Sequence, residues 1–105
     1  LIVTTLAQIL INRFWFNLEY DKCIQNLRLH HQLIPNRIQY ESHNQPSDSL
    51  FDYLAEKGHS FEPIYRCRRS AANTIFVSQA DSLNSDVRTI TAIGDSRKYG
   101  GVAGY

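Results

Sequence analysis

The hydrophobic pattern at the start of the chain predicts a helix over residues 1–16. Polar side chains fall at Thr5, Gln8 and Asn12, one narrow stripe at helical spacing, and almost every other position is apolar. A helix with so wide an apolar face is largely buried between other elements. Because a chain of 105 residues can hardly surround such a helix, we expect a partner segment outside this sequence. Thr4 and Thr5 are interpreted as ordinary helix residues rather than nucleophiles.

The same periodicity predicts two further helices. The helix over residues 19–27 has a single apolar stripe, formed by Tyr20, Cys23, Ile24 and Leu27. The helix over residues 47–57 has an apolar side formed by Leu50, Phe51, Leu54 and Ala55. Ser47 or Asp48 can cap the start of this last helix, and Gly58 lies where a helix usually stops.

Alternating apolar and polar positions predict about four strands, over residues 37–41, 61–66, 72–79 and 87–93. Pro63 places the second of these at a sheet edge, because proline has no N–H to donate. The last two strands flank a polar, turn-rich segment and are expected to pair as an antiparallel hairpin with a longish loop. Three helices beside an antiparallel sheet form an α+β arrangement. Residues 1–105 are interpreted as one incomplete domain of this class.

Composition and charge argue against several classes of partner. The formal net charge is +1, so nothing draws the chain as a whole toward nucleic acid or acidic membranes. Residues 1–11 are apolar but too few to span a bilayer, which needs about 20 residues. Arg66, Arg68 and Arg69 are interpreted as a charged turn rather than a phosphate site. The chain begins with Leu1 and contains no methionine, so we expect that it is a processed fragment or that its N-terminal part is missing.

The cysteines and histidines do not have the spacing of metal ligands. His30 and His31 are adjacent, and neighbouring residues point to different sides of a helix or strand. Neither Cys-x-x-Cys nor His-x-x-x-His occurs, so no metal site is expected. Cys23 and Cys67 allow one disulfide, but two buried thiols are the favoured interpretation.

The last eleven residues combine a charged cluster, Asp95-Ser96-Arg97-Lys98, with three glycines and a final Gly104-Tyr105. Each glycine is free to take a positive φ, and this composition suits a tail that is tied down. The tail resembles the C-terminus of gamma-glutamyltransferase light subunits. Three other segments are similar to that family in the same order, residues 2–8, 28–35 and 50–58. Leu27 stands where the family usually has proline.

The resemblance implies part of a four-layer αββα sandwich of the N-terminal-nucleophile hydrolase class. Family members cut themselves into heavy and light subunits, and the new N-terminal threonine attacks the γ-glutamyl carbonyl of glutathione. The γ-glutamyl group then passes to water, an amino acid or a dipeptide, without a metal or organic cofactor. The nucleophile, the glutamate-binding residues and a glycine pair precede Leu1 in the family. No catalytic or substrate-binding residue is therefore assigned, and the 105 residues alone are predicted to be inactive.

The residues carried over from the family are structural. Arg28 and Arg97 match family arginines that resemble buried anchors, and Asp95 is the natural local carboxylate. A guanidinium offers five donors in a rigid fork, so it can tie carbonyls and a carboxylate together. We expect these groups to hold the tail and the Arg28 segment against the sheet that bears the nucleophile. The competing interpretation is that they are exposed charges that contribute little.

The sequence leaves two alternative interpretations open besides that of an enzyme fragment. One is a small binding or interaction module with a closed core of its own. The other is a homologue that is catalytically dead even when complete. The expected partners of an enzyme fragment are the heavy subunit and the N-terminal part of the light subunit, with glutathione as substrate of the whole. The resemblance implies the outer face of the plasma membrane, through an anchor on the heavy subunit, or else a periplasmic or secreted location.

Overall fold

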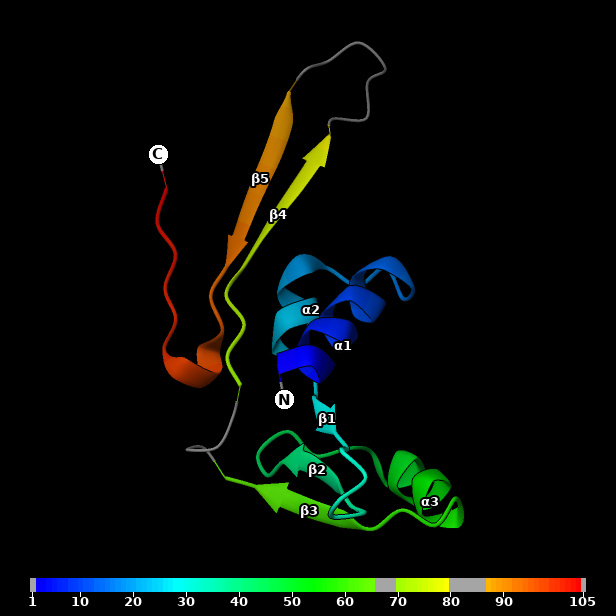
Figure 1. Cartoon of the computed structure of the whole chain (residues 1–105). Helices are drawn as coiled ribbons and strands as arrows, with labels where there is room; N and C mark the ends of the chain where they lie inside the picture. The colour runs from blue at the N-terminus through cyan, green and yellow to red at the C-terminus, as the bar shows by residue number, and fades with distance from the viewer. Residues whose placement is uncertain (1, 66–69, 80–86, 105) are drawn as a thin grey trace.

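Two small sheets lie at opposite ends of an elongated molecule, with two helices between them (Figure 1). This computed structural model describes residues 2–65, 70–79 and 87–104. The described helices are α1 (Ile2–Phe14), α2 (Tyr20–Gln25), α3 (Asp48–Glu56) and the 3-10 turn η2 (Ser96–Lys98). The described strands are β1 (Leu29–His30), β2 (Ile38–Glu41), β3 (Phe61–Ile64), β4 (Thr74–Gln79) and β5 (Arg88–Ile93). The mixed α and β content agrees with the predicted class.

The first sheet has the order β1-β2-β3 and differs from the predicted antiparallel sheet. β1 and β2 are antiparallel, but β2 and β3 run parallel, with Ile38 opposite Phe61 and Glu41 opposite Ile64. The expectation of a purely antiparallel sheet was therefore wrong. α3 lies between β2 and β3 in the chain and carries it back to the same end of the sheet, as a parallel pair requires. Pro63 lies on the edge strand β3, as predicted.

α3 begins and ends as its sequence predicts. The Ser47 side chain accepts a hydrogen bond from the Leu50 N–H at 3.3 Å, which caps the first turn. Gly58 follows the helix with φ 87°, a conformation in the left-handed region that favours glycine. Phe51 packs edge-to-face on Phe61 at 4.6 Å between ring centroids, which fixes the helix on the sheet.

The second sheet is the predicted antiparallel hairpin of β4 and β5, with Thr74 opposite Ile93 and Gln79 opposite Arg88. Burial alternates along β4. Phe76 faces the helices and lies 4.5 Å from the ring of Tyr20. Ile75, Val77 and Ile90 are exposed on the other face.

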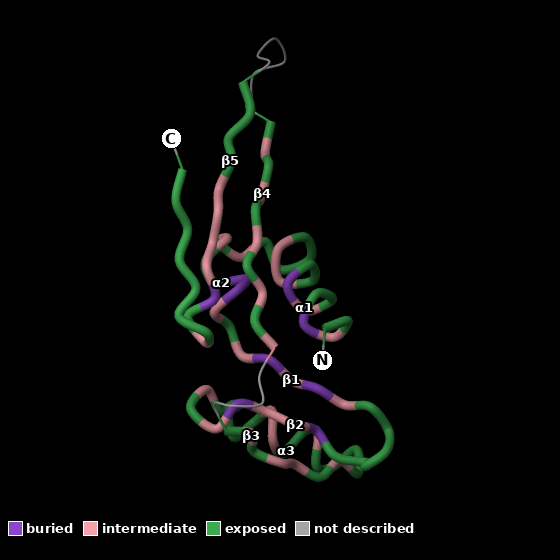
Figure 2. The backbone as a smooth tube through the Cα atoms, turned by 60° about the vertical axis from the view of Figure 1, so that its left-hand side comes forward, coloured by how far each residue is buried: buried purple, intermediate pink, exposed green. Residues whose placement is uncertain are grey.

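The small core lies where α1 and α2 meet this hairpin. Ile9, Cys23 and Ile24 are buried there, and Leu18, Ala72, Phe76 and Ile93 pack around them (Figure 2). The prediction that Cys23 is a core residue is confirmed, and burial raises the pKa of its free thiol. Cys67 lies outside the described residues, as do Arg66, Arg68 and Arg69, so the interpretations placed on them stay predictions.

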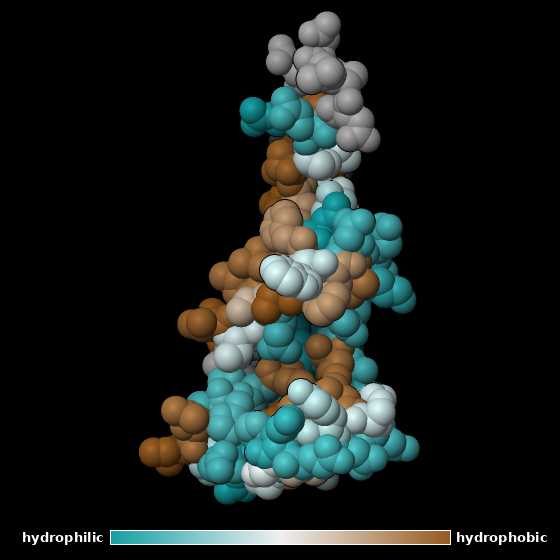
Figure 3. Space-filling view, turned by 90° about the vertical axis from the view of Figure 1, so that its right-hand side faces the viewer, coloured by the Kyte–Doolittle hydropathy of each residue, from teal (hydrophilic) through white to brown (hydrophobic). Residues whose placement is uncertain are grey.

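The first helix forms as predicted, and its polar stripe packs against the other described segments. Thr5 is buried, and its hydroxyl lies 2.6 Å from the Ser70 hydroxyl. Gln8 donates to the Leu29 carbonyl at 2.7 Å and accepts from the Leu29 N–H at 2.9 Å. The apolar side faces outward instead, in an exposed set formed by Ile2, Val3, Leu6, Leu10, Ile11, Phe14, Trp15 and Phe16 (Figure 3). Among the described residues only Ile9 of the apolar side is buried, in the core with α2, so the expected burial of the rest by a segment outside this sequence stays a prediction.

Candidate functional site

Asp95 is the centre of a buried polar network where β5 ends. Its carboxylate is fully buried and accepts two backbone hydrogen bonds. Ala72 N–H donates to Oδ2 at 2.8 Å, and Arg97 N–H donates to Oδ1 at 3.0 Å. The second bond makes Asp95 the N-cap of η2. Backbone N–H groups of the segment before β4 and of the tail thus hold the carboxylate in addition to its side-chain partners.

Arg28 reaches Asp95 from the segment after α2. Its Nη1 lies 3.0 Å from Asp95 Oδ2 and donates to the Ser70 carbonyl at 3.0 Å. Its Nη2 donates to the Ile24 carbonyl at 2.8 Å. Arg28 is only 8% exposed, so this pair lies in the interior, where water screens it little.

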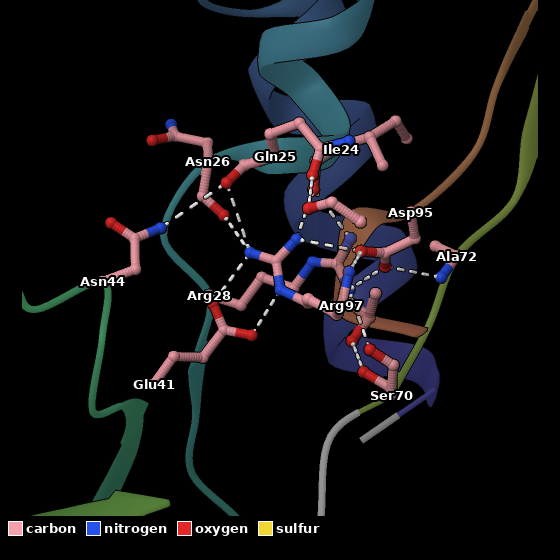
Figure 4. A network of polar contacts seen from close by, with 12 residues as sticks. Ile24, Gln25, Asn26, Arg28, Glu41, Asn44, Ser70, Ala72, Asp95 and Arg97 are labelled. Atoms are coloured by element: carbon pink, nitrogen blue, oxygen red, sulfur yellow. Dashed lines mark hydrogen bonds and ion pairs between the residues drawn. The ribbon is translucent and has the colours of Figure 1, made fainter. Parts of the chain in front are cut away.

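Arg97 binds the other Asp95 oxygen and a second acid. Its Nη1 lies 3.3 Å from Asp95 Oδ1. Its Nε donates to Glu41 Oε1 and its Nη2 donates to Glu41 Oε2 at 2.7 Å, a bidentate pair (Figure 4). The two side chains are each 3% exposed. The network therefore contains two arginines and two acids, with a formal charge of zero.

The same guanidinium also closes the C-terminal end of α2. Arg97 Nη1 donates to the Ile24 carbonyl at 2.8 Å, and Nη2 donates to the Asn26 carbonyl at 2.7 Å and the Gln25 carbonyl at 3.3 Å. The last carbonyls of a helix lack intrahelical donors and carry partial negative charge. Arg97 thus adds side-chain donors to the C-terminal end of this six-residue helix, together with Arg28, which donates to the same Ile24 carbonyl.

Burial and charge act in opposite directions on these groups. Burial alone raises the pKa of Asp95, but the N–H groups of Ala72 and Arg97 and the two guanidinium groups outweigh it, and the pKa is lowered. Burial lowers the pKa of Arg28, and the positive charge of nearby Arg97 lowers it further. The Asp95 carboxylate raises this pKa but does not offset the other two effects. For Arg97 the hydrogen bonds and charge of Glu41 outweigh burial, and the pKa is raised. Arg28 is therefore the less well compensated cation.

Lowering the pH should reduce the contribution of this network to the stability of the fold. The usual pKa of 3.8 for Asp95 is lowered in the folded state, so its contribution to stability is complete above that value and is lost as pH falls toward the folded-state pKa. We expect the difference in melting temperature between the full-length parent protein and its Asp95→Asn variant to shrink from pH 7 to pH 3. The exposed Glu62→Gln variant serves as control. A difference that stayed constant over this range would contradict the lowered pKa.

The structure brings together all three residues that the sequence singled out. Arg28, Asp95 and Arg97 meet in one network, and the partner that sequence reasoning missed is Glu41. The sequence could have pointed to Glu41. Two buried arginines need more than one carboxylate as partners, and Glu41 is an acid at the end of a predicted strand. The role of the three residues as anchors for the tail stays a prediction.

The other candidate residues form structural contacts. His30 is buried, with Nδ1 2.8 Å from the Thr4 hydroxyl and Nε2 3.1 Å from Gln32 Oε1. His31 and His59 stack edge-on at 5.3 Å. Within residues 2–65, 70–79 and 87–104 no group of three metal-ligating side chains comes together.

Close backbone packing also holds the tail. Gly100, Gly101 and Gly104 do not use their freedom to take a positive φ, and Tyr99 occupies the left-handed region with φ 54°. At Gly94, an added Cβ would lie 2.7 Å from the Gly100 carbonyl oxygen. Glycine is thus needed at position 94 because the backbone of residue 100 lies so close to it, and not because a turn requires a positive φ.

Alanine at position 94 should therefore destabilise the fold. Either the tail moves away or a backbone oxygen is compressed, and overpacking of this kind costs about 1–3 kcal/mol. Urea unfolding of the full-length Gly94→Ala variant measures the effect. Gly101→Ala is the matched control, since nothing lies within 4 Å of a Cβ there. Equal stabilities of the two variants would count against tight packing of the tail.

Comparison with solved structures defines the class of fold. The chain is similar to an acivicin-inhibited gamma-glutamyltranspeptidase, with a TM-score of 0.76 and 21% identity over 92% of this chain and 48% of that one. It is also similar to a mutant of the Helicobacter pylori gamma-glutamyltranspeptidase, with a TM-score of 0.75 and 20% identity over 90% of this chain and 47% of that one. The fold is that of part of an N-terminal-nucleophile hydrolase, as predicted.

Sequence comparison identifies the family. The profile of the gamma-glutamyltranspeptidase family matches residues 1–105, and the chain belongs to this family. Glutathione hydrolase 2 of Arabidopsis thaliana is 27% identical over 111 residues, which cover 99% of this chain and 19% of that protein. The chain thus spans about a fifth of the length of this relative. For the acivicin-inhibited enzyme, the C-terminus has critical roles in autoprocessing and catalysis.

Among the described residues, no helix combines the length and the apolar character needed to cross a membrane.

Proposed function

We propose that this chain is the C-terminal part of the light subunit of a gamma-glutamyltransferase. The complete enzyme cleaves the γ-glutamyl bond of glutathione and transfers the γ-glutamyl group to water, an amino acid or a dipeptide. The observation that carries the proposal is the family match over residues 1–105, together with the fold. Within that enzyme these residues supply scaffold, and the threonine nucleophile comes from a preceding segment.

The exposed apolar surface supports a scaffold over a self-contained binding module. Large apolar side chains of α1 and the outer face of the hairpin, such as Phe14 and Ile75, are 78% and 68% exposed. The radius of gyration is 16.4 Å, whereas a compact domain of this length has about 13 Å. Both properties fit a layer that packs against the rest of the light subunit and the heavy subunit of the same proenzyme.

The buried network is the proposed structural contribution of this part. Arg97 and Asp95 hold the tail against α2 and β2, and Arg28 holds the segment after α2 against the same carboxylate. The critical role of the C-terminus in a solved relative supports this assignment. The sequence Asp95-Ser96-Arg97-Lys98 resembles animal members, which supports a location at the outer face of the plasma membrane.

The test is to express the full-length parent protein and the isolated 105-residue chain. We expect the parent to cleave itself into two subunits and to release glutamate from glutathione, and the isolated chain to do neither. A parent that stayed uncleaved and inactive would favour the dead homologue. Glutamate release by the isolated chain, or its cooperative unfolding as a monomer, would favour the self-contained alternative.

A further inference from the structure

A small cavity with both polar and apolar lining residues adjoins the charge network on the side of Arg28. Its volume is about 20 Å³, and its polar lining comes from Thr4, Thr5, Gln39, Glu41 and Ser70, with Arg28 and His30. Arg28 Nε is buried and has no hydrogen-bond partner among the described residues, although Nη1 and Nη2 of the same group each have at least one partner. Buried donors of charged groups are nearly always satisfied, so this one points to a ligand.

We propose that this cavity binds a single water molecule that joins Arg28 to Glu41. The water accepts a hydrogen bond from Arg28 Nε and donates to a Glu41 carboxylate oxygen and to the Thr5–Ser70 hydroxyl pair. Both Glu41 oxygens already accept from Arg97, but a carboxylate has about four acceptor sites, so capacity remains. A hydroxyl likewise accepts after it has donated.

Size and charge both select water. A cavity needs roughly 10–15 Å³ of this kind of volume to hold one water, so about 20 Å³ is enough for one water molecule. The Glu41 carboxylate lines the same space as Arg28 and disfavours an anion, while the Arg28 donor disfavours a cation. A neutral molecule that both donates and accepts is the remaining fit.

The water makes the network a closed ring. Arg28 contacts Asp95, Asp95 contacts Arg97, and Arg97 contacts Glu41. The water supplies the missing link from Glu41 back to Arg28. Three segments far apart in sequence, around residues 28, 41 and 95–97, are then tied together, and Arg28 gains a fourth polar contact.

A crystal structure of the full-length parent protein, at a resolution that places ordered waters, tests the site. We expect one water within hydrogen-bond distance of both Arg28 Nε and Glu41. A second crystal soaked in sodium bromide should show no anomalous peak there. An empty cavity, a protein group bound to Arg28 Nε, or a bromide peak would each overturn the proposal.

The Arg28→Lys variant provides a second test of the water site. Lysine keeps the positive charge but lacks the Nε donor, so we expect the water to be lost from this position. The exposed Arg37→Lys variant should leave the water in place. If Arg28→Lys fails to fold, the wild-type map and the bromide soak decide the matter. The water site depends only on the fold, so its failure leaves the proposed enzymatic function unaffected.

Discussion

Replacing Arg97 by alanine is expected to lower the free energy of unfolding of the full-length parent protein by about 3–5 kcal/mol. The substitution leaves the buried Glu41 carboxylate without its bidentate partner and Asp95 without one of its two cations. It also removes one donor from each of the last carbonyls of α2. We expect a lower yield of self-cleaved enzyme for the same reason. Urea unfolding and the fraction of processed subunits measure the two effects.

The matched control is Arg37→Ala. Arg37 pairs with Glu62 at 3.2 Å, but these side chains are 45% and 36% exposed. Exposed pairs contribute about 0.2–1 kcal/mol, so this variant should stay close to wild type. The double variant Arg97→Ala/Glu41→Ala should be less destabilised than the sum of its single variants, because it removes the unpaired charge. If Arg97→Ala behaved like Arg37→Ala, the buried network would have no structural importance.

The second large effect is expected for Asp95→Ala, which should cost a similar amount, about 3–5 kcal/mol. Removal of the carboxylate leaves Arg28 without an anion, and the Ala72 and Arg97 N–H groups lose their acceptor. Arg97 keeps Glu41, so we expect the tail to loosen around Arg28 first. Chemical denaturation of the full-length parent measures the loss, and hydrogen exchange at the amide of Ala72 locates it.

Glu62→Ala is the control for this experiment, because it removes a carboxylate from an exposed pair. It should shift the unfolding midpoint by no more than about 1 kcal/mol. Unchanged stability of Asp95→Ala, with Ala72 still protected from exchange, would mean that the backbone alone positions the tail. That result would contradict the anchor proposed for Arg28 and Arg97.

Local patterns predicted the helices and strands well, and they failed where pairing depends on distant segments. Periodicity is visible over the thirteen residues of α1 and the six residues of β4. β1 has only two residues, too few to alternate, and it forms because β2 lies beside it. The parallel pairing of β2 with β3 likewise depends on how α3 packs, which no local pattern records.

In the charge network, too, the sequence predicted the local part and missed the part that depends on a distant segment. The tail motif identified Arg97 and Asp95, because both lie within one short recognisable segment. Glu41 lies 56 residues before its partner Arg97 in the sequence, so nothing local joins them. The exposed apolar side of α1 has a related cause. A wide apolar side indicates burial, but it does not say whether the covering segment is among these residues.

The capping of α2 by Arg97 has a consequence for the order of folding. The carbonyls of Ile24 and Asn26 receive their donors from a side chain 73 and 71 residues later. Contacts of such long range close late, and synthesis delivers the C-terminus last. We therefore expect this short helix to receive its full set of C-terminal hydrogen bonds only after residue 97 has been synthesised and has packed against it.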